Sequence, residues 1–168
     1  MAKKFSVPVI LGTAREGRQS EKVAHAIMDV FEEREDIVAQ LIDARVYSHG
    51  RTIPSWEEND TIHPWRQVMA EADAFLIVTP EYNHGYPGEL KMLLDQGFDA
   101  YAGKPVVVCG VSSGQLGGAR VVENLLPVLR ELGMITSQYS LYVSNVGEFE
   151  ADKAFRKRVN KAGDILVS

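Results

Sequence analysis

The sequence has only one cysteine, Cys109, and it lies inside the apolar run Val106–Val111. One cysteine excludes an internal disulfide, and its apolar surroundings predict a buried side chain. No apolar run approaches the roughly 20 residues of a membrane-spanning helix. The stretch between Lys4 and Gly12 is too short for the core of a signal peptide. We therefore expect a cytoplasmic protein without a membrane partner.

An excess of positive charge is also missing. The chain has 18 Lys and Arg residues against 23 Asp and Glu, a net charge of −5, and the basic residues are scattered. A protein whose main partner is nucleic acid would present a basic face, so we expect no nucleic-acid partner. An anionic small molecule is not excluded, because one or two local cations are enough to bind it.

Metal-ligand spacing is absent as well. His25, His49, His63 and His84 form no pair at such spacing, and Cys109 has no partner. We therefore expect no metal site and no catalytic acid–base triad. His84 has two interpretations: a proton donor to a reduced acceptor, or a loop residue that makes one hydrogen bond.

Five short apolar runs alternate with segments of helical spacing over the 168 residues. Short, continuously apolar runs are typical of parallel strands that are buried on both faces. Strands alternating with helices predict an α/β fold of three layers, with one parallel sheet between two helical layers. No linker or repeat divides the chain, so we expect one domain over residues 1–168. The expected strands are Phe5–Leu11, Ile37–Ile42, Ala74–Val78, Val106–Val111 and Met134–Val143.

Helical periodicity places helices between these strands. Apolar residues recur at helical spacing after Ser20, from about Pro64 to Glu71, after Gly88, from Val121 to Leu132, and from Asp152 to Leu166. Gly133 is expected to end the fourth helix. Pro127 lies inside that helix and should kink it, because proline removes an internal hydrogen bond.

The segment Gly12–Ser20, which reads GTAREGRQS, joins the first expected strand to the first expected helix. The N–H groups and the dipole at a helix start favour an anion. Thr13 and Ser20 add hydroxyl groups, and the planar guanidinium of Arg15 can hold a phosphate in two places. Ser20 is also expected to cap the helix, which does not exclude phosphate binding.

Two better-known phosphate loops do not match this segment. Gly12 and Gly17 have the glycine spacing of a P-loop, but Arg18 and Gln19 stand where Lys and Ser or Thr are required. The dinucleotide fingerprint G-x-G-x-x-G is absent. Asp43 could imitate a ribose-binding acid, although a plain loop position is the simpler interpretation. The segment therefore suits one terminal phosphate.

Two further loops are expected at the same edge of the sheet. The first and third strands flank the topological switch point of a sheet ordered 2-1-3-4-5, a crevice that holds FMN in folds of that order. After the third strand, Glu81, Tyr82 and Asn83 offer an acceptor, a flat face and an amide, which suit a flat heterocycle. After the fourth strand, Ser112–Gly118 is rich in small residues that let a ligand approach the backbone.

The segments GTAREGRQSEKVA, TPEYNHGYPGELK and SSGQLGGARVVENLLPVLRELG resemble the NADPH-dependent FMN reductases. This group of flavodoxin-like enzymes includes quinone, azo-dye and chromate reductases. The resemblance covers roughly residues 5–142. It implies a flavodoxin-like fold with a five-stranded parallel sheet in the order 2-1-3-4-5, bound FMN, and NADPH or NADH as electron donor. It also implies a small-molecule electron acceptor and a homodimer or homotetramer.

The resemblance assigns candidate roles to residues of all three loops. Lys91 matches the family pattern, whereas Met92 stands where asparagine is usual and Gln96 where tryptophan is common. The residues implied at the cofactor are Thr13, Arg15 and Ser20 at the phosphate, Pro80, Glu81, Tyr82, Asn83 and Gly85 beside the isoalloxazine ring, and Ser112, Ser113 and Gly114 at its other edge.

The expected function is a flavin-dependent NAD(P)H oxidoreductase whose chemistry belongs to the cofactor, so no side chain is assigned as catalytic. Amides near Ser113 and Gly114 would stabilise the reduced flavin, and Arg18 would meet the phosphate of NADPH. Two alternatives remain: a flavodoxin that carries electrons without reacting with NAD(P)H, and a binding module that has lost its flavin. Retention of Arg15 and Ser20 argues against the second.

Overall fold

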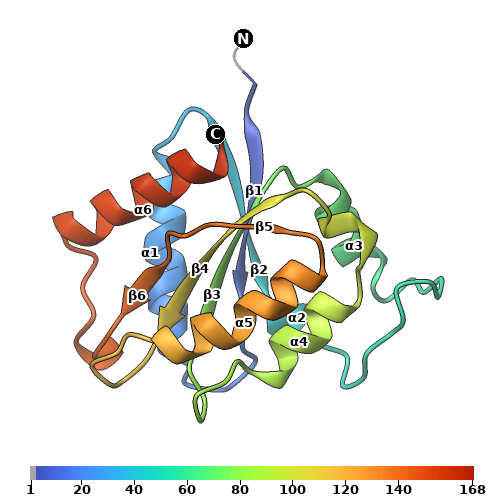
Figure 1. Cartoon of the computed structure of the whole chain (residues 1–168), viewed down its shortest axis with the longest axis horizontal. Helices are drawn as coiled ribbons and strands as arrows, with labels where there is room; N and C mark the ends of the chain where they lie inside the picture. Colours follow the sequence, from blue (N-terminus) through green and yellow to red (C-terminus); the bar gives the residue numbers. More distant parts are fainter. Residues whose placement is uncertain (1–2) are drawn as a thin grey trace.

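A computed structural model describes residues 3–168. Its centre is a parallel sheet ordered β2-β1-β3-β4-β5, with β6 also pairing with β4 (Figure 1). This confirms the predicted flavodoxin-like order 2-1-3-4-5. The strands are β1 (Phe5–Leu11), β2 (Ile37–Asp43), β3 (Phe75–Pro80), β4 (Pro105–Val111), β5 (Ile135–Thr136) and β6 (Leu141–Val143).

Helices cover both faces of the sheet, as the alternating pattern predicted (Figure 1). One core cluster joins α1 (Ser20–Glu32) and α6 (Lys153–Leu166) to one face. A second cluster joins α3 (His63–Glu71), α4 (Gly88–Asp95) and α5 (Ala119–Glu131) to the other face. Alternation along β3 divides its side chains between the two clusters, with Leu76 in the first and Ile77 in the second.

The fifth expected strand is broken, which corrects the prediction of one strand over Met134–Val143. β5 pairs with the start of β4, where Pro105 faces Ile135, and β6 pairs with its end, where Cys109 faces Leu141. Between the two strands, the Ser137 N–H still donates to the Val106 carbonyl of β4 at 3.3 Å, and the Ser137 hydroxyl accepts a hydrogen bond from the Tyr139 N–H at 2.9 Å. Such a local bond competes with the strand ladder, so polar residues interrupt the run.

The link between β2 and β3 contains a short helix that the sequence pattern did not predict, α2 (Ala44–Tyr47). An irregular segment follows before α3. Arg66 of α3 holds this segment, because its guanidinium donates to the carbonyl oxygens of Glu57 at 2.6 Å and Pro54 at 2.7 Å. The predicted α3 is confirmed.

The other helix boundaries agree with the sequence signals. α5 continues through Pro127 and ends before Gly133, whose φ is 72°. The Gly133 N–H bonds to the Arg130 carbonyl at 2.9 Å and the Met134 N–H to the Leu129 carbonyl at 3.0 Å, which is a Schellman cap. Short 3-10 turns, η1 (Asp99–Tyr101) and η2 (Val146–Glu148), complete the elements.

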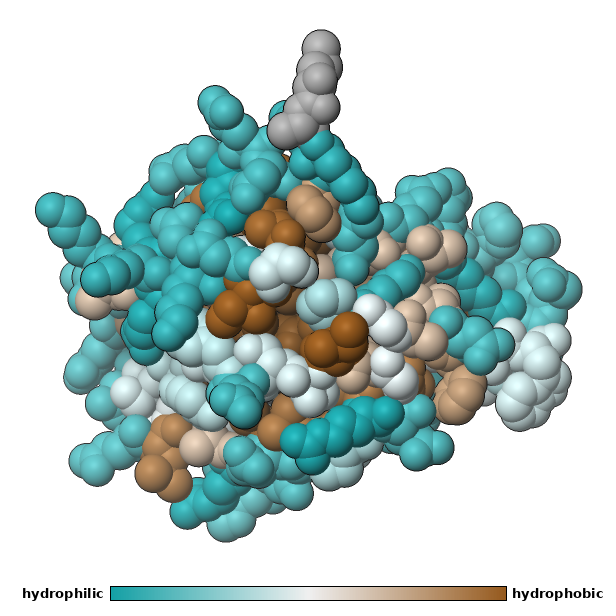
Figure 2. Space-filling model, turned by 45° about the horizontal axis from the view of Figure 1, so that its top comes forward, coloured by the Kyte–Doolittle hydropathy of each residue, from teal (hydrophilic) through white to brown (hydrophobic). Residues whose placement is uncertain are grey.

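The burial of side chains follows their polarity. Cys109 is fully buried and free, as predicted, and burial raises the pKa of its thiol to about 12. Hydrophilic side chains cover most of the face drawn in Figure 2, and hydrophobic ones gather near its middle. Within residues 3–168, no helix is long and apolar enough to cross a membrane.

Candidate functional site

The loops after β1, β3 and β4 meet at the carboxyl edge of the sheet, at the bottom of Figure 1. They enclose a cleft of about 210 Å³, which we call the switch-point cleft because β1 and β3 are neighbours there. Most of the predicted site residues line it. The lining residues are Arg15, Gly17, Arg18, Gln19, Ser20, Pro80, Glu81, Tyr82, Val111, Ser112, Ser113 and Val146.

Thr13 lies beneath the first loop and joins it to the second. Its side chain is fully buried, and its hydroxyl lies 3.2 Å from the phenol oxygen of Tyr82. The same hydroxyl accepts the Arg15 N–H at 3.3 Å. The Gly12 N–H donates to the Val78 carbonyl at 2.9 Å, so the loop starts in register with β3. These contacts make Thr13 a link between loops and not part of the cleft wall.

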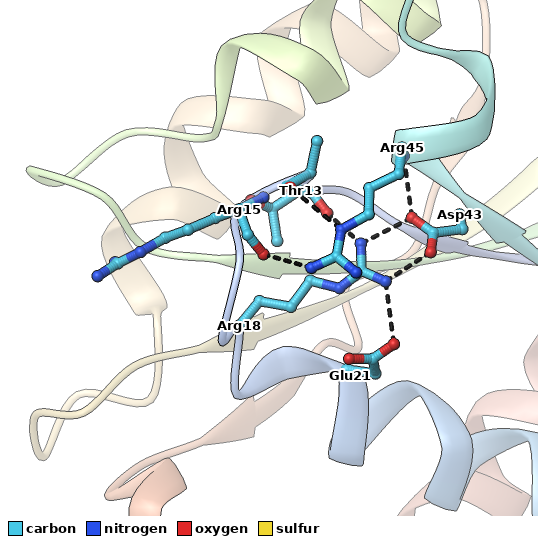
Figure 3. Close-up of polar contacts among 7 residues, drawn as sticks. Thr13, Arg15, Arg18, Glu21, Asp43 and Arg45 are labelled. Carbon is cyan, nitrogen blue, oxygen red and sulfur yellow. Dashed lines mark hydrogen bonds and ion pairs between the residues drawn. The ribbon is translucent and has the colours of Figure 1, made fainter.

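Arg15 is exposed and extends away from the loop (Figure 3). It lies beside the Tyr82 ring, with its guanidinium carbon 5.5 Å from the ring centre. Among the described residues no carboxylate pairs with Arg15. The side chain is therefore a cation at the mouth of the cleft, next to a flat aromatic face.

Ser20 begins α1 but does not cap it, which corrects the capping prediction. Gln19 occupies the cap position, and no side chain caps the helix there. Ser20 is only 2% exposed, and its hydroxyl oxygen is buried and has no hydrogen-bond partner in the part of the chain that the structure describes. Leaving a buried polar group unpaired costs free energy, so such groups are uncommon and mark places where a ligand or water can bind. Its position at a helix start favours an anion.

Arg18 turns inward, which contradicts the expectation that it meets the phosphate of NADPH (Figure 3). Its guanidinium binds both oxygens of Asp43, at 2.7 and 2.5 Å, and one oxygen of Glu21 at 3.0 Å. It also donates to the Thr13 carbonyl at 2.5 Å. Its terminal nitrogens are therefore committed to protein groups, and only Nε is buried without a partner.

The charges around Arg18 shift one another's pKa. The hydrogen bonds that Arg18 donates to Asp43 raise the pKa of Arg18 against the opposing effect of burial. Burial by itself would raise the pKa of Asp43, but the bonds from Arg18 and from the Arg45 N–H outweigh it and hold that pKa below its usual range. Asp43 ends β2 and caps α2, so it is a structural acid and not a ribose ligand.

The second loop contains a tight turn, in which Tyr82 and Gly85 exchange both backbone hydrogen bonds, at 2.9 and 3.0 Å. The residues between them, Asn83 and His84, have φ values of 50° and 68°. Left-handed backbone is uncommon for residues other than glycine and is concentrated at functional sites. Asn124 of α5 holds this turn by donating to the His84 carbonyl at 2.6 Å. Asn83 and His84 are exposed at its tip.

Glu81 joins the second loop to α5. Its carboxylate lies 3.5 Å from a guanidinium nitrogen of Arg120 and accepts the Val121 N–H at 3.4 Å. A carboxylate is favourable at the first turn of a helix, because it complements the unpaired N–H groups there. The side chain of Glu81 is only 10% exposed. It therefore supports the shape of the cleft in addition to lining it.

The third loop uses its glycines differently from the prediction. A Cβ atom on Gly118 would lie 2.6 Å from the Val111 nitrogen, and one on Gly110 would lie 2.6 Å from the Gly118 carbonyl oxygen. This close approach therefore joins β4 to the start of α5. Only Gly114 faces open space, and its carbonyl oxygen accepts the Ser112 hydroxyl at 3.0 Å.

A larger cleft of about 630 Å³ lies elsewhere, between the segment before α3 and the ends of α4 and α5. We call it the apolar cleft. It carries two exposed aromatic side chains, Trp56 at 86% and Phe98 at 51%. Lys91, a matched family position, lines it and pairs with Asp95 at 2.6 Å. Its lining is Thr52, Pro54, Ser55, Trp56, Lys91, Asp95, Gly97, Phe98, Pro127, Val128, Glu131 and Leu132.

The two departures from the family pattern lie near α4. Met92 is half-buried, and Gln96 is fully buried with its side-chain oxygen unpaired. The described residues contain no group of three His, Cys, Asp or Glu side chains placed to hold a metal ion.

The sequence pattern did not indicate Arg45, whose side chain donates to the carbonyls of Ala14 and Arg15. Its position two residues after the structural acid Asp43 was the only available signal.

Comparisons with known proteins identify the family and the relatives of this chain. The family model described as NADPH-dependent FMN reductase matches residues 5–148. The chain is 28% identical over 147 residues to the NAD(P)H-dependent FMN reductase LOT6 of Saccharomyces cerevisiae, covering 77% of this chain and 76% of the relative. It is 33% identical over 140 residues to a quinone reductase of Escherichia coli K12, covering 77% and 71%.

A solved structure with the same fold is FerB from Paracoccus denitrificans, described as a flavoenzyme NAD(P)H:(acceptor) oxidoreductase. The two chains superpose with a TM-score of 0.75 over 97% of this chain and 95% of the other. Their sequences are 23% identical, so this likeness establishes the flavodoxin-like fold and no more.

Proposed function

The chain belongs to the NADPH-dependent FMN reductase family, and from that premise we propose that it is an FMN-dependent NAD(P)H oxidoreductase. FMN binds at the switch-point cleft. NADPH or NADH donates hydride, and the electrons pass to a small-molecule acceptor such as a quinone, an azo dye, a metal oxyanion or free flavin. Family membership supports the reaction class, and the cleft supports the place.

The observation that carries the placement is the buried, unpaired hydroxyl of Ser20 at the start of α1. A phosphate oxygen would complete its hydrogen bonding where the helix N-terminus already favours an anion. Arg15 stands at the same mouth, has no carboxylate partner among residues 3–168, and adds a charged donor. The cleft residues therefore fit the terminal phosphate of FMN.

The other loops suit the isoalloxazine ring. Pro80, Glu81 and Tyr82 form one wall, and Ser112 and Ser113 form another. The remaining predicted residues lie in the same loops: Thr13 below, Asn83 and Gly85 in the tight turn, and Gly114 facing open space. The cleft, at about 210 Å³, is smaller than the roughly 300–1,000 Å³ of ordinary ligand pockets. A ring bound there keeps one face accessible, which a second substrate requires.

When bound, FMN supplies the hydride and electron transfer chemistry. The protein fixes the phosphate, orients the ring and leaves one face free. Backbone N–H groups near Ser113 and Gly114 are the proposed donors that stabilise negative charge on the reduced ring. No side chain is assigned as a proton donor, and His84 lies exposed at the tip of the tight turn.

The proposal extends to assembly and location. The apolar cleft, with Trp56 and Phe98 exposed, supports a homodimer or homotetramer formed through that face. Light scattering should give a multiple of 18.6 kDa, and a stable particle of 18.6 kDa at micromolar concentration would contradict it. The chain acts as a single FMN-binding domain, in the cytoplasm, where NAD(P)H is available and the lone thiol of Cys109 stays reduced.

Anaerobic reduction tests the function directly. The FMN-loaded protein should lose its flavin absorbance within seconds of the addition of NADPH or NADH. The absorbance should return when a quinone is added. A flavodoxin-type carrier would keep its oxidised spectrum with either nucleotide and bleach only with dithionite. That result would overturn the proposed enzyme activity while leaving FMN binding intact.

A further inference from the structure

Three consecutive carbonyl oxygens of the first loop accept hydrogen bonds from two arginines (Figure 3). Arg18 donates to the carbonyl of Thr13 at 2.5 Å. Arg45 donates to the carbonyls of Ala14 at 3.1 Å and Arg15 at 2.7 Å. Arg18 belongs to the loop itself and Arg45 lies in α2, so the loop is held from within and by the element that follows β2.

Asp43 anchors both arginines. Its two oxygens bind Arg18 at 2.7 and 2.5 Å, and its Oδ1 also accepts the Arg45 N–H at 2.9 Å, which starts α2. Glu21 completes the group at 3.0 Å from Arg18. We call Arg18, Glu21, Asp43 and Arg45 the arginine cluster. Its two positive and two negative charges cancel, so it brings no net charge to a nearby ligand.

Peptide planarity gives these bonds a consequence for the loop. In a trans peptide the C=O of one residue and the N–H of the next point in opposite directions. Carbonyls turned toward the arginine cluster therefore turn the N–H groups of Ala14, Arg15 and Glu16 away from it. The Arg15 N–H makes only a long bond of 3.3 Å to the Thr13 hydroxyl. Successive N–H groups directed to one side form an anion-binding concavity.

We propose that Asp43, Arg18 and Arg45 are positioning residues for the FMN phosphate. They hold the loop carbonyls and thereby present the loop N–H groups to the ligand, without touching the ligand through their terminal nitrogens. This inference rests on the proposed function, because it assumes that the phosphate of FMN binds at this loop.

Arg45 provides the cleanest variants, because it is exposed and its loss leaves no buried charge. Arg45→Met removes both donors to the loop carbonyls. FMN affinity should fall about threefold to tenfold, the value of one or two ordinary hydrogen bonds. Riboflavin lacks the phosphate, so its affinity should stay within about twofold. Arg34→Met is the control, because the Arg34 side chain also donates to a backbone carbonyl, that of Asn160, but it lies at the opposite end of β2, where it binds Asp36.

Arg45→Lys separates geometry from charge. Lysine keeps the positive charge but cannot reach two carbonyls with one planar group. The inference predicts that Arg45→Lys loses nearly as much FMN affinity as Arg45→Met. Full recovery with lysine would mean that charge alone matters and would overturn the positioning role.

Asp43→Asn supplies a second, independent variant. An asparagine oxygen can still accept the Arg45 N–H and cap α2, but the bidentate bond to Arg18 is weakened. The ratio of FMN affinity to riboflavin affinity should therefore fall further than in Arg45→Met. Fluorescence titration measures the ratio, and circular dichroism confirms folding at the titration temperature. If the parent binds the two flavins equally, the proposed phosphate site fails. If the parent prefers FMN and the Arg45 and Asp43 variants keep that ratio, only the positioning inference fails.

Discussion

Strand β2 carries an arginine–aspartate pair at each end, and the two pairs differ in what else the arginine holds. At the amino end, Arg34 binds both oxygens of Asp36, at 2.9 and 2.7 Å, and reaches Asp164 of α6 at 2.8 Å. At the carboxyl end, Arg18 binds Asp43 and then a loop carbonyl. The Arg18 side chain is 1% exposed and that of Arg34 is 13% exposed.

The same arginine–aspartate interaction therefore has two different roles at the two ends of β2. The amino-end pair joins two elements that already have regular structure, so its loss affects stability. The carboxyl-end pair shapes an irregular loop beside a cleft that contains an unpaired hydroxyl, so its loss affects a ligand. The following predictions compare a change at the carboxyl edge with a chemically matched change elsewhere.

The largest expected effect is on FMN affinity in Arg15→Ala. A charged hydrogen bond contributes roughly 1.5–3 kcal/mol, so FMN binding should weaken about tenfold to a hundredfold. Riboflavin affinity should barely change, and Arg15→Lys should recover only part of the loss. The control is Arg156→Ala, which removes a partly exposed arginine that pairs with Glu33. Fluorescence titration measures both affinities. An equal loss of affinity for FMN and riboflavin would mean that Arg15 supports the fold.

Ser20→Ala should have opposite effects on ligand affinity and stability. FMN affinity should fall roughly tenfold, because a hydroxyl bond to phosphate is lost. Stability of the flavin-free protein should not fall, because the hydroxyl that is removed had no partner.

The control for Ser20 is Ser137→Ala. The Ser137 hydroxyl accepts the Tyr139 N–H, so its loss should lower the free energy of unfolding by about 0.5–1.5 kcal/mol without changing flavin affinity. Urea unfolding measures both variants. Destabilisation by Ser20→Ala equal to that of Ser137→Ala would show that Ser20 has an ordinary structural bond.

The contrast between Arg15 and Arg18 shows where prediction from the sequence ends. The strands were predictable, because parallel strands buried on both faces are continuously apolar, and the loops follow from where the strands stop. Two arginines three residues apart in one loop look alike in sequence. Arg18 turns inward to bind both oxygens of Asp43, 25 positions away, as well as the nearby Glu21 and Thr13. That pairing depends on β2 lying beside β1, which no local pattern contains.

A similar limit applies to glycines and serines. Gly114 and Gly118 belong to the same loop, yet only the backbone of β4 reveals that Gly118 is required for packing. Ser20 has the sequence signature of a helix cap, but Gln19 takes that position. Local propensity predicts that a hydroxyl is useful at a helix start, and only the three-dimensional contacts show what it can bind.

Arg34→Gln should have a smaller effect, limited to stability. Its bonds to Asp36 and Asp164 are partly exposed, and such pairs contribute up to about 1 kcal/mol. The melting temperature should fall by about 2–4 °C, and FMN and riboflavin affinities should both stay at the parent values. Differential scanning calorimetry measures the first and fluorescence titration the second. A selective loss of FMN affinity would remove the distinction between the two ends of β2.

The smallest expected effect is the change in the free energy of unfolding as the pH is lowered from neutrality. The pKa of Asp43, which faces Arg18, Glu21 and Arg45, lies below its usual range, and so does that of Asp36 beside Arg34. The pKa of an aspartate in the unfolded chain is about 3.9. When folding lowers that pKa, the aspartate stabilises the folded protein at every pH above about 3.9. Stability should therefore be constant from pH 7 to about 5 and fall below about pH 4. Asp43→Asn should show a shallower fall in urea unfolding, and an unchanged slope would contradict this assignment.

The most direct test of the account is the affinity of the parent protein for FMN, riboflavin and FAD in one fluorescence titration. The account places one terminal phosphate against Ser20 and Arg15, so FMN should bind at least about tenfold more tightly than riboflavin. FMN should also bind more tightly than FAD, because the flavin phosphate of FAD is joined to a second phosphate and is no longer terminal. Equal affinities for FMN and riboflavin, or a preference for FAD, would contradict a phosphate site at the carboxyl edge.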